Sequence, residues 1–588
     1  MAVFSKVLVA NRGEIAIRVF RTLRELGIGT VAVYSEADRV AAHVVYADEA
    51  YLIGGGPPAE SYLHQERILD SAQRAGAEAI HPGYGFLAEN ARFARACAER
   101  GIVWIGPPPE AIEAMGSKIE ARERMRAAGV PIIPGVTEAV ESADEVRRLG
   151  DELGWPIAIK ASAGGGGKGL KVVRQSGEAA RAFESARREG EAYFSDASVY
   201  VERYLEDPRH VEVQVLADAH GHVIHLGERD CTIQRRHQKL VEETPSPAVD
   251  ASLRERIGAI AVEAARAVGY QSAGTIEGLL SRESEYFFLE MNTRIQVEHT
   301  VTEMVTGLDL VREQVLIASG ESLSLRQEEV RLSGHAIECR INAEDVSNAF
   351  LPAPGMISRY REPAGPGVRV DSGVVAGSEV SPLYDPLIAK LVVHGSDREH
   401  ARRRMLRALD EFVVKGVKTL IGFHKALLTH LCFVEGETCH GLVESELMAA
   451  RAAELEAEGP TVGADVAVPG LREDVRSIEV DGRRFEVRLL RPEPGFAELA
   501  RRRRERARGG VGAGAGRDAI VSPMQGTVLA VEVAEGDEVE AGQVLCIVEA
   551  MKMENEVHAH RAGRVRELSV APGQPVKTGQ VICVVTAD

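Results

Sequence analysis

An internal repeat in the C-terminal part of the chain restricts the fold more than any other feature. Residues 526–550 align without gaps to residues 563–587, and 12 of the 25 positions are identical. Each copy alternates apolar and polar residues and carries turn glycines, which is the pattern of several short β-strands. Two such copies are expected to pack as a small all-β sandwich with approximate two-fold symmetry.

Lys552 lies between the two copies, in the turn Glu549–Glu554 (EAMKME). A hairpin tip at this point would project the lysine into water, and most exposed lysines are only solvated surface residues. Here Met551 and Met553 flank the lysine at the centre of a pseudo-symmetric domain. The segment resembles the biotinyl attachment motif of biotin carrier domains; lipoyl domains are related, but their lysine typically lacks methionine on both sides. The resemblance implies biotin covalently bound to Lys552.

Residues 509–516 are almost pure glycine and alanine, a composition typical of a flexible tether. Eight extended residues reach about 28 Å. A carrier domain that visits two active sites needs such a tether, although a simple spacer has the same composition.

Chain length and net charge limit the number of domains and the class of ligand. At 588 residues the chain is expected to hold three or more domains. Its net charge of −18 argues against a general nucleic-acid binder, so an anionic substrate would need a local cluster of cations and backbone N–H groups.

Seven scattered cysteines show neither the spacing of a zinc site nor the density of a disulfide framework, which favours a reducing cytoplasm. No apolar run approaches the roughly 18 residues of a membrane span, and the N-terminus does not look like a signal peptide.

Residues 1 to about 115 alternate strand-like runs with helical patterns, which indicates a parallel sheet. Similar patterns recur farther along the chain. The elements that we expect are strands at Lys6–Ala10, Thr30–Tyr34 and Pro156–Lys160, a helix that ends near Leu26, and a helix at Arg398–Phe412.

A glycine-rich run, Ala163–Gly169 (AGGGGKG), follows the strand expected at Pro156–Lys160. It is not a Walker A loop, because Gly169 stands where Ser or Thr would be needed. Four consecutive glycines are entropically costly, and such a run suits a flap whose bare N–H groups close on phosphates. A floppy surface loop is the alternative, but Lys118 and Lys160 nearby favour the phosphate site.

Residues 1–447 carry a dense series of motifs that resembles the ATP-grasp fold of biotin carboxylases. In chain order these motifs are Ala10–Ala16 (ANRGEIA), His81–Gly85 (HPGYG), Gly227–Cys231 (GERDC), Gln234–Lys239 (QRRHQK), Glu290–His299 (EMNTRIQVEH) and Glu338–Glu344 (ECRINAE). With a biotinyl domain behind them, the chain resembles the alpha subunits of bacterial acetyl-, propionyl- and other acyl-CoA carboxylases, in which a biotin carboxylase is fused to its biotin carboxyl carrier protein.

The resemblance implies an α/β (α+β) multidomain chain. The expected regions are a Rossmann-like N-terminal α/β domain at 1–115, an ATP-grasp domain at 116–331, a mixed C-terminal carboxylase domain at 332–447, a region at 448–517 with a hairpin near Ser477–Leu489 and the linker, and an all-β biotinyl domain at 518–588.

Polar residues occupy every second position from Glu290 to Glu298. In an extended chain they would share one face, which would be unusually polar for a core strand. Eight steps of about 3.3 Å span roughly 26 Å, too long for one small-anion site. The chain must therefore bend after Asn292 or Arg294 if all five polar residues serve one centre.

The resemblance implies that Glu277, Glu290 and Asn292 hold Mg²⁺ or Mn²⁺ through oxygen ligands beside the ATP phosphates. Histidines are more often structural than functional, so His210 and His237 carry less weight in the nucleotide set. The residues implied for ATP are Lys118, Lys160, Gly164, Gly165, Gly166, Gly167, Glu202, Arg203, Leu205, His210, Gln234 and His237.

Bicarbonate would be held by Arg294, a bidentate donor, with Gln296 and the backbone of Val297. Glu298 would be the general base that removes the bicarbonate proton. By the same resemblance, bicarbonate attacks the γ-phosphoryl group of ATP, and the carboxyphosphate formed releases CO₂ for the biotin nitrogen. Lys239 would contact the phosphate and bicarbonate groups, and Arg340 would stabilise the enolate oxygen of biotin.

Three other interpretations were weighed against this one. A single-chain pyruvate carboxylase would need several hundred more residues between the two ends. Another ATP-grasp ligase would explain the glycine run but not Lys552, and a non-catalytic biotin carrier would not explain the charged set around Glu298.

The expected partners are a separate carboxyltransferase (beta) subunit, a biotin protein ligase and further copies of the chain, with no nucleic acid or membrane. We expect the hairpin near Ser477–Leu489 to dock the carboxyltransferase, because a lone two-stranded hairpin is marginally stable in water. The resemblance places the enzyme in fatty-acid synthesis or propionate metabolism and leaves the acyl chain length open.

Overall fold

The computed structural model describes residues 3–136, 138–161, 170–194, 197–458, 471–480, 483–492, 518–550 and 553–586. The chain divides into two units, one of residues 1–381 and 386–458 and one of residues 382–385 and 459–588.

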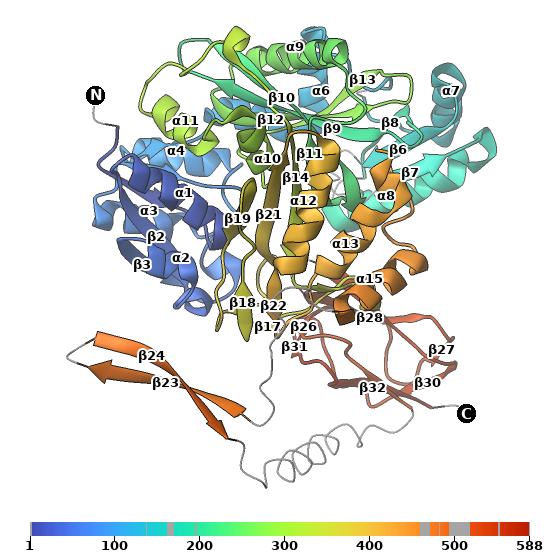
Figure 1. The fold of residues 1–588 in the computed structure, drawn as a ribbon. Helices are drawn as coiled ribbons and strands as arrows, with labels where there is room; N and C mark the ends of the chain where they lie inside the picture. The colour runs from blue at the N-terminus through green and yellow to red at the C-terminus, as the bar shows by residue number, and fades with distance from the viewer. Residues whose placement is uncertain are drawn as a thin grey trace. The chain divides into compact units, whose positions relative to one another are not determined.

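The first unit begins with a parallel sheet of strand order β3-β2-β1-β4-β5, as its sequence pattern predicts (Figure 1, blue). Helix α1 forms because Ile15, Val19 and Leu23 recur at helical spacing and are buried. The elements are β1 (Lys6–Val9), α1 (Gly13–Glu25), β2 (Gly29–Ser35), α2 (Ala42–Tyr46), β3 (Glu49–Gly54), α3 (Gln65–Ala75), β4 (Ala79–His81), α4 (Ala91–Glu99), β5 (Val103–Trp104) and α5 (Pro109–Gly116).

A separate small sheet of order β7-β6-β8 follows, with its own apolar core that includes Val146, Phe183 and Val201. The glycine run between β6 and β7, residues 162–169, lies outside the described residues. The elements here are α6 (Lys118–Ala127), α7 (Ala143–Leu153), β6 (Ile157–Ala161), β7 (Leu170–Val173), α8 (Ala179–Phe194) and β8 (Val199–Arg203).

An eight-stranded antiparallel sheet of order β13-β12-β9-β10-β11-β14-β21-β19 is the centre of the unit (Figure 1). Because β11 pairs with β14, this sheet runs unbroken across position 331/332, where the sequence placed a domain boundary. Its strands are β9 (Arg209–Ala217), β10 (Val223–Arg235), β11 (Gln238–Thr244), β12 (Ser272–Leu280), β13 (Tyr286–Asn292), β14 (His335–Asn342), β19 (Val368–Ser372) and β21 (Leu387–Gly395).

Helices cover this sheet, and α15 packs against α13. Glu446–Glu458 falls in the first unit, which extends to residue 458, whereas the resemblance implies a boundary at 447/448. The helices are α9 (Ala251–Ala267), α10 (His299–Thr306), α11 (Leu310–Ala318), α12 (Arg398–Glu411), α13 (Ile421–Thr429), α14 (Leu431–Val434) and α15 (Glu446–Glu458). Short strand pairs complete the unit: β15 (Glu344–Asp345) with β16 (Leu351–Pro352), β17 (Gly355–Met356) with β20 (Glu379–Val380), and β18 (Arg359–Arg361) with β22 (Val413–Lys415).

The strands and helices expected at Lys6–Ala10, Thr30–Tyr34, Pro156–Lys160 and Arg398–Phe412 are confirmed, with each end within one residue. A disulfide joins Cys432 to Cys439, a pair that the sequence did not single out; the other five cysteines are free and buried. Among the described residues, no helix is both long and apolar enough to cross a membrane.

The second unit contains a two-stranded hairpin of β23 (Leu471–Val480) and β24 (Arg483–Pro492). The strands pair from Leu471 opposite Pro492 to Val480 opposite Arg483, so the hairpin is longer than the expected Ser477–Leu489. The Gly/Ala linker at 509–516 lies outside the described residues.

Two four-stranded sheets form the sandwich that the repeat predicts, with strand orders β25-β32-β30-β27 and β29-β28-β26-β31. Each sheet takes strands from both copies of the repeat: β26 pairs with β31, and β27 with β30. The strands are β25 (Ala519–Val521), β26 (Gly526–Val531), β27 (Glu538–Val539), β28 (Val544–Ala550), β29 (Met553–His558), β30 (Gly563–Arg566), β31 (Pro575–Val576) and β32 (Val581–Thr586).

Gly373, in the loop after β19, lies against the start of α1. A Cβ at this position would lie 2.6 Å from the backbone nitrogen of Glu14, so backbone would have to move. We expect Gly373→Ala to lower the free energy of unfolding by about 1–3 kcal/mol in urea titrations. Gly177→Ala is the matched control, because nothing lies within 4 Å of its Cβ position. Equal losses in the two variants would contradict this tight packing.

Candidate functional site

The ammonium group of Lys239, on β11, lies among three buried carboxylates. Its Nζ is 2.5 Å from Glu212 Oε2, 2.6 Å from Glu298 Oε1 and 3.0 Å from Glu277 Oε1. Glu212 and Glu277 stand opposite each other on the paired strands β9 and β12. Buried charges are tolerated only when they are paired and hydrogen-bonded, so each of these four groups depends on the others.

Glu298 also contacts Arg340, whose Nη2 lies 2.9 Å from Glu298 Oε2 and whose Nε donates to Glu242 Oε1 at 2.6 Å. Burial alone would raise the pKa of Glu298, but Lys239 and Arg340 hold it well below its usual value. Burial raises the pKa of Glu242 to about 7 despite Arg340. Glu298 is therefore ionised at neutral pH, the state that can accept a proton.

The segment from Glu290 to Glu298 bends where its length requires it to. Strand β13 ends at Asn292, and α10 begins at His299. The bend brings Gln296 back to Glu277, where its Nε2 donates to Oε1 at 2.5 Å, beside Asn292 Nδ2 at 2.8 Å. The prediction of a bend after Asn292 or Arg294 is confirmed.

The three predicted metal ligands lie on two adjacent strands. Glu277 stands opposite Glu290, and Asn292 lies opposite Thr275 in the same β12–β13 pair. Carboxylate and amide oxygens are the ligands that Mg²⁺ prefers, so the chemistry of this set fits the metal.

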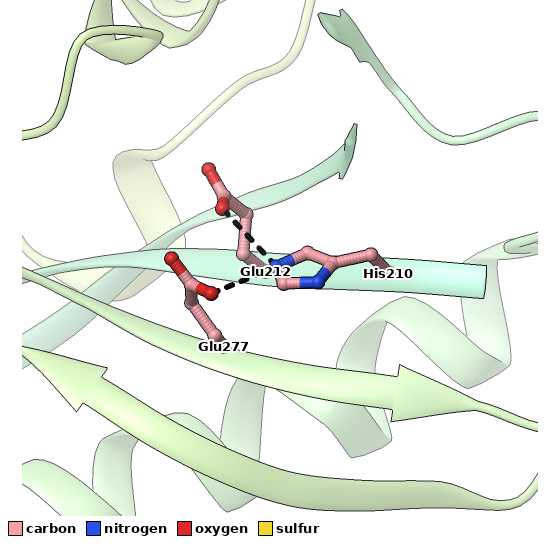
Figure 2. A group of neighbouring side chains, drawn as sticks. All are labelled: His210, Glu212 and Glu277. Carbon is pink, nitrogen blue, oxygen red and sulfur yellow. Dashed lines mark ion pairs between the residues drawn. The ribbon is translucent and has the colours of Figure 1, made fainter. Parts of the chain in front are cut away.

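His210 belongs to the carboxylate cluster, as Figure 2 shows. Its Nε2 lies 2.8 Å from Glu277 Oε2 and 3.8 Å from Glu212 Oε2. Burial lowers the pKa of His210, but the Glu277 and Glu212 carboxylates together raise it above its usual value. Lys239 touches the same two carboxylates, so His210 and Lys239 share them.

Apart from His210, the described residues predicted to bind the nucleotide lie in two places. Lys160 on β6 forms an ion pair with Glu202 on the neighbouring strand β8, and Arg203 and the buried Leu205 follow Glu202 along the chain. Gln234 and His237 belong instead to the end of β10 and the turn before β11.

Gln234 Nε2 donates to the Cys231 carbonyl at 2.7 Å, and His237 has a left-handed backbone with φ 65°. Gly164–Gly167 lie outside the described residues, as does the side chain of Lys118 at the start of α6.

Arg294 is held by the N-terminal region. Its Nε donates to Glu89 Oε2 at 2.9 Å, and its Nη2 donates to Asn292 Oδ1 at 2.8 Å. The first two motifs also meet, because Asn11 Nδ2 donates to the carbonyls of Pro82 and Tyr84, both at 2.7 Å. Motifs far apart in the sequence thus converge on one region.

Two important residues were missed by the sequence reasoning. Arg229 is fully buried, and its guanidinium donates to Glu212 Oε1 at 2.5 Å and to Gln296 Oε1 at 2.8 Å. Glu212 could have been found, because His210, Glu212 and Gln214 occupy alternate positions of a strand that is otherwise apolar after Arg209.

Ala550 and Met553 pair at the end of the β28–β29 ladder, and Met551 and Lys552 connect them in the sequence. Lys552 itself lies outside the described residues.

Comparison with known proteins places this geometry in a family. Four family models match: the biotin carboxylase N-terminal domain at residues 3–112, the ATP-binding domain of the carbamoyl-phosphate synthase L chain at 117–326, the biotin carboxylase C-terminal domain at 338–445, and a domain of biotin-requiring enzymes at 518–585.

Among curated proteins, the chain is 46% identical over 573 residues to a biotin-dependent acyl-coenzyme A carboxylase alpha3 subunit of Mycobacterium leprae, covering 95% of both chains. It is 55% identical over 433 residues to biotin carboxylase 1 of Bacillus subtilis, covering 74% of this chain and 96% of that one.

Two solved structures are similar. One is the biotin carboxylase domain dimer of Hydrogenobacter thermophilus 2-oxoglutarate carboxylase with MgADP, ADP and bicarbonate (TM-score 0.71, 49% identity, 75% of this chain and 99% of that one). The other is a Campylobacter jejuni biotin carboxylase–nucleotide complex (TM-score 0.72, 45% identity, 75% and 98%).

The fold is thus the ATP-grasp fold of biotin carboxylases, followed by a biotinyl-type domain, as the sequence predicts. This chain belongs to the biotin carboxylase family and is an ATP-dependent ligase.

We expect Arg229→Met to lower the free energy of unfolding by about 3–5 kcal/mol, because it leaves the fully buried Glu212 with less compensation. Arg282→Met removes an exposed arginine that pairs with Asp207 at the surface, and it should change stability little. Urea unfolding of both variants measures the difference. Similar losses in the two would show that burial of the Arg229 charge is unimportant.

Proposed function

We propose that this chain uses ATP and bicarbonate to carboxylate biotin on its own Lys552 and then supplies the carboxyl group to a separate carboxyltransferase subunit of an acyl-CoA carboxylase. The observation that carries the proposal is the buried cluster of Lys239, Glu277, Glu298 and Arg340 on the same chain as a biotinyl-type domain.

Glu277, Glu290 and Asn292 would hold Mg²⁺ (or Mn²⁺), which neutralises phosphate charge when bound. Lys118, Lys160 and the backbone of Gly164–Gly167 would hold the phosphates of ATP. The remaining members proposed for the nucleotide pocket are Glu202, Arg203, Leu205, His210, Gln234 and His237. Among them, His210 contacts the proposed metal ligand Glu277.

Arg294, Gln296 and the backbone N–H of Val297 would bind bicarbonate, and Glu298 would take its proton as an oxygen attacks the γ-phosphorus. The ionised state of Glu298 supports this role. Lys239 would stabilise negative charge between bicarbonate and phosphate. Arg340, with a guanidinium already beside Glu298, would bind the biotin oxygen.

The partners are inferred from similarity. The Mycobacterium leprae relative is named as an acyl-coenzyme A carboxylase alpha subunit and matches nearly the whole chain, which supports a carboxyltransferase partner. A biotin protein ligase would modify Lys552, and the solved domain dimer supports a homo-oligomer. Acetyl-, propionyl- and longer acyl-CoA all fit the proposal, as do a cytoplasmic location and a role in fatty-acid or propionate metabolism.

Transfer of labelled bicarbonate to the biotinylated chain tests the central proposal. With MgATP and no partner, we expect the wild type to become labelled and Lys552→Ala to stay unlabelled, because it carries no biotin. Glu298→Gln should lose at least about 99% of the rate, since a proton acceptor contributes roughly 10²–10⁴-fold. Lys577→Ala, an exposed lysine in the same domain, is the control and should label normally. An unlabelled wild type that mass spectrometry shows to carry biotin would refute the proposal.

The hairpin β23–β24 is the proposed docking element for the carboxyltransferase, because it forms a two-stranded sheet by itself. We expect deletion of residues 470–495 to abolish co-purification with that subunit and to leave labelling of the chain by bicarbonate intact. Retained binding by the deleted chain would exclude the hairpin as the dock. Loss of labelling as well would show that the deletion damages the enzyme itself.

A further inference from the structure

Lys390 is a fully buried lysine for which the proposed function has no role. It lies on β21, and its Nζ donates to the backbone carbonyl of Val297 at 3.0 Å. The same nitrogen is 3.3 Å from Glu14 Oε2 and 3.9 Å from Asp371 Oδ2, and it lies 5.8 Å from the centre of the Tyr84 ring. Lys390 therefore contacts the first two sequence motifs, the turn after β13, and β19.

The carbonyl that Lys390 binds belongs to the peptide bond between Val297 and Glu298. A peptide unit is planar and stiff, so holding its oxygen also restricts the backbone nitrogen of Glu298. Glu298 stands at the N-terminus of α10, and its carboxylate contacts Lys239 and Arg340. Lys390 thus fixes the backbone while Lys239 and Arg340 fix the side chain.

Glu14, the carboxylate beside Lys390, is also held in place. Glu14 lies in the first turn of α1, 5% exposed, and Gly373 approaches its backbone so closely that a Cβ would overlap it. Burial raises the pKa of Glu14 to about 7, and the Lys390 ammonium opposes this rise. A buried ammonium needs such an anionic partner to remain charged.

We propose that Lys390 is a positioning residue that, held by Glu14, sets the Val297–Glu298 peptide in the orientation that bicarbonate binding requires. This inference rests on the proposed function of the same turn. It explains why a charged side chain is completely buried at this point, where an apolar residue would pack at lower cost.

The test measures the single-turnover rate of labelling of the full biotinylated chain against bicarbonate and, separately, against MgATP. We expect Lys390→Met to raise the half-saturating bicarbonate concentration by about tenfold or more, the effect of losing a charged hydrogen bond. The half-saturating MgATP concentration should stay within about twofold, and Lys390→Arg should restore part of the bicarbonate affinity.

Arg18→Met is the matched control. Arg18 is a buried cation on the same helix as Glu14, but it binds Glu303 and Asp309 at 2.7 and 2.6 Å and not the bicarbonate turn. This variant should lose stability without a selective change in the bicarbonate dependence. A purely structural role for Lys390 would instead lower the active fraction of Lys390→Met and leave both half-saturation values unchanged.

Glu14→Gln keeps the inference testable if Lys390→Met does not fold, because it preserves the shape of the side chain. We expect it to raise the half-saturating bicarbonate concentration about threefold, since the hydrogen bond from Lys390 to Val297 loses part of its support. Unchanged bicarbonate dependence in a folded Glu14→Gln chain would overturn the inference. A wild type that shows no ATP-dependent labelling would instead overturn the proposed function.

Discussion

The ion pairs of Lys239 are the interaction on which the site depends. One ammonium group contacts carboxylates from β9, β12 and the turn after β13, and without it three buried negative charges would face one another at close range. The geometry of the large sheet follows from this requirement, because β9, β11 and β12 must all deliver charged side chains to one point. Arg229 and Arg340 extend the network of polar contacts to Gln296 and Glu242.

Local features of the fold could be predicted, whereas long-range pairings could not. The repeat predicts the sandwich, and apolar spacing predicts β1, α1, β2, β6 and α12 to within one residue. The pairing of β11 with β14 joins residues about a hundred positions apart, and no local sequence pattern predicts it. The packing of α15 against α13 is equally long-range, and the domain boundary that the resemblance implies at 447/448 does not follow from it.

The features of the site also divide into those that local sequence predicts and those that only the fold reveals. The length of the segment Glu290–Glu298 predicts its bend, which is a matter of chain geometry alone. Family motifs identify Lys239, Glu298 and Arg340, but the roles assigned to them stay predictions until they are measured. Lys390 escapes such reasoning because a single basic residue in the sequence looks like a surface residue, and Arg229 lies within the motif Gly227–Cys231 but was given no role. Only the folded chain shows that each is enclosed and which groups neutralise it.

The exchange of strands between the two halves of the sandwich has a consequence for protein synthesis. Strand β25 at the start of the domain pairs with β32 at its end, and β26 pairs with β31. Neither half has a complete sheet of its own, so the domain cannot close until the ribosome has released residues 581–586. Lys552 precedes the second copy in the sequence and is therefore synthesised before it. An enzyme that recognises the folded domain must therefore act after the whole sandwich has been translated. A chain whose synthesis stops inside the second copy would contain the lysine but not the folded domain.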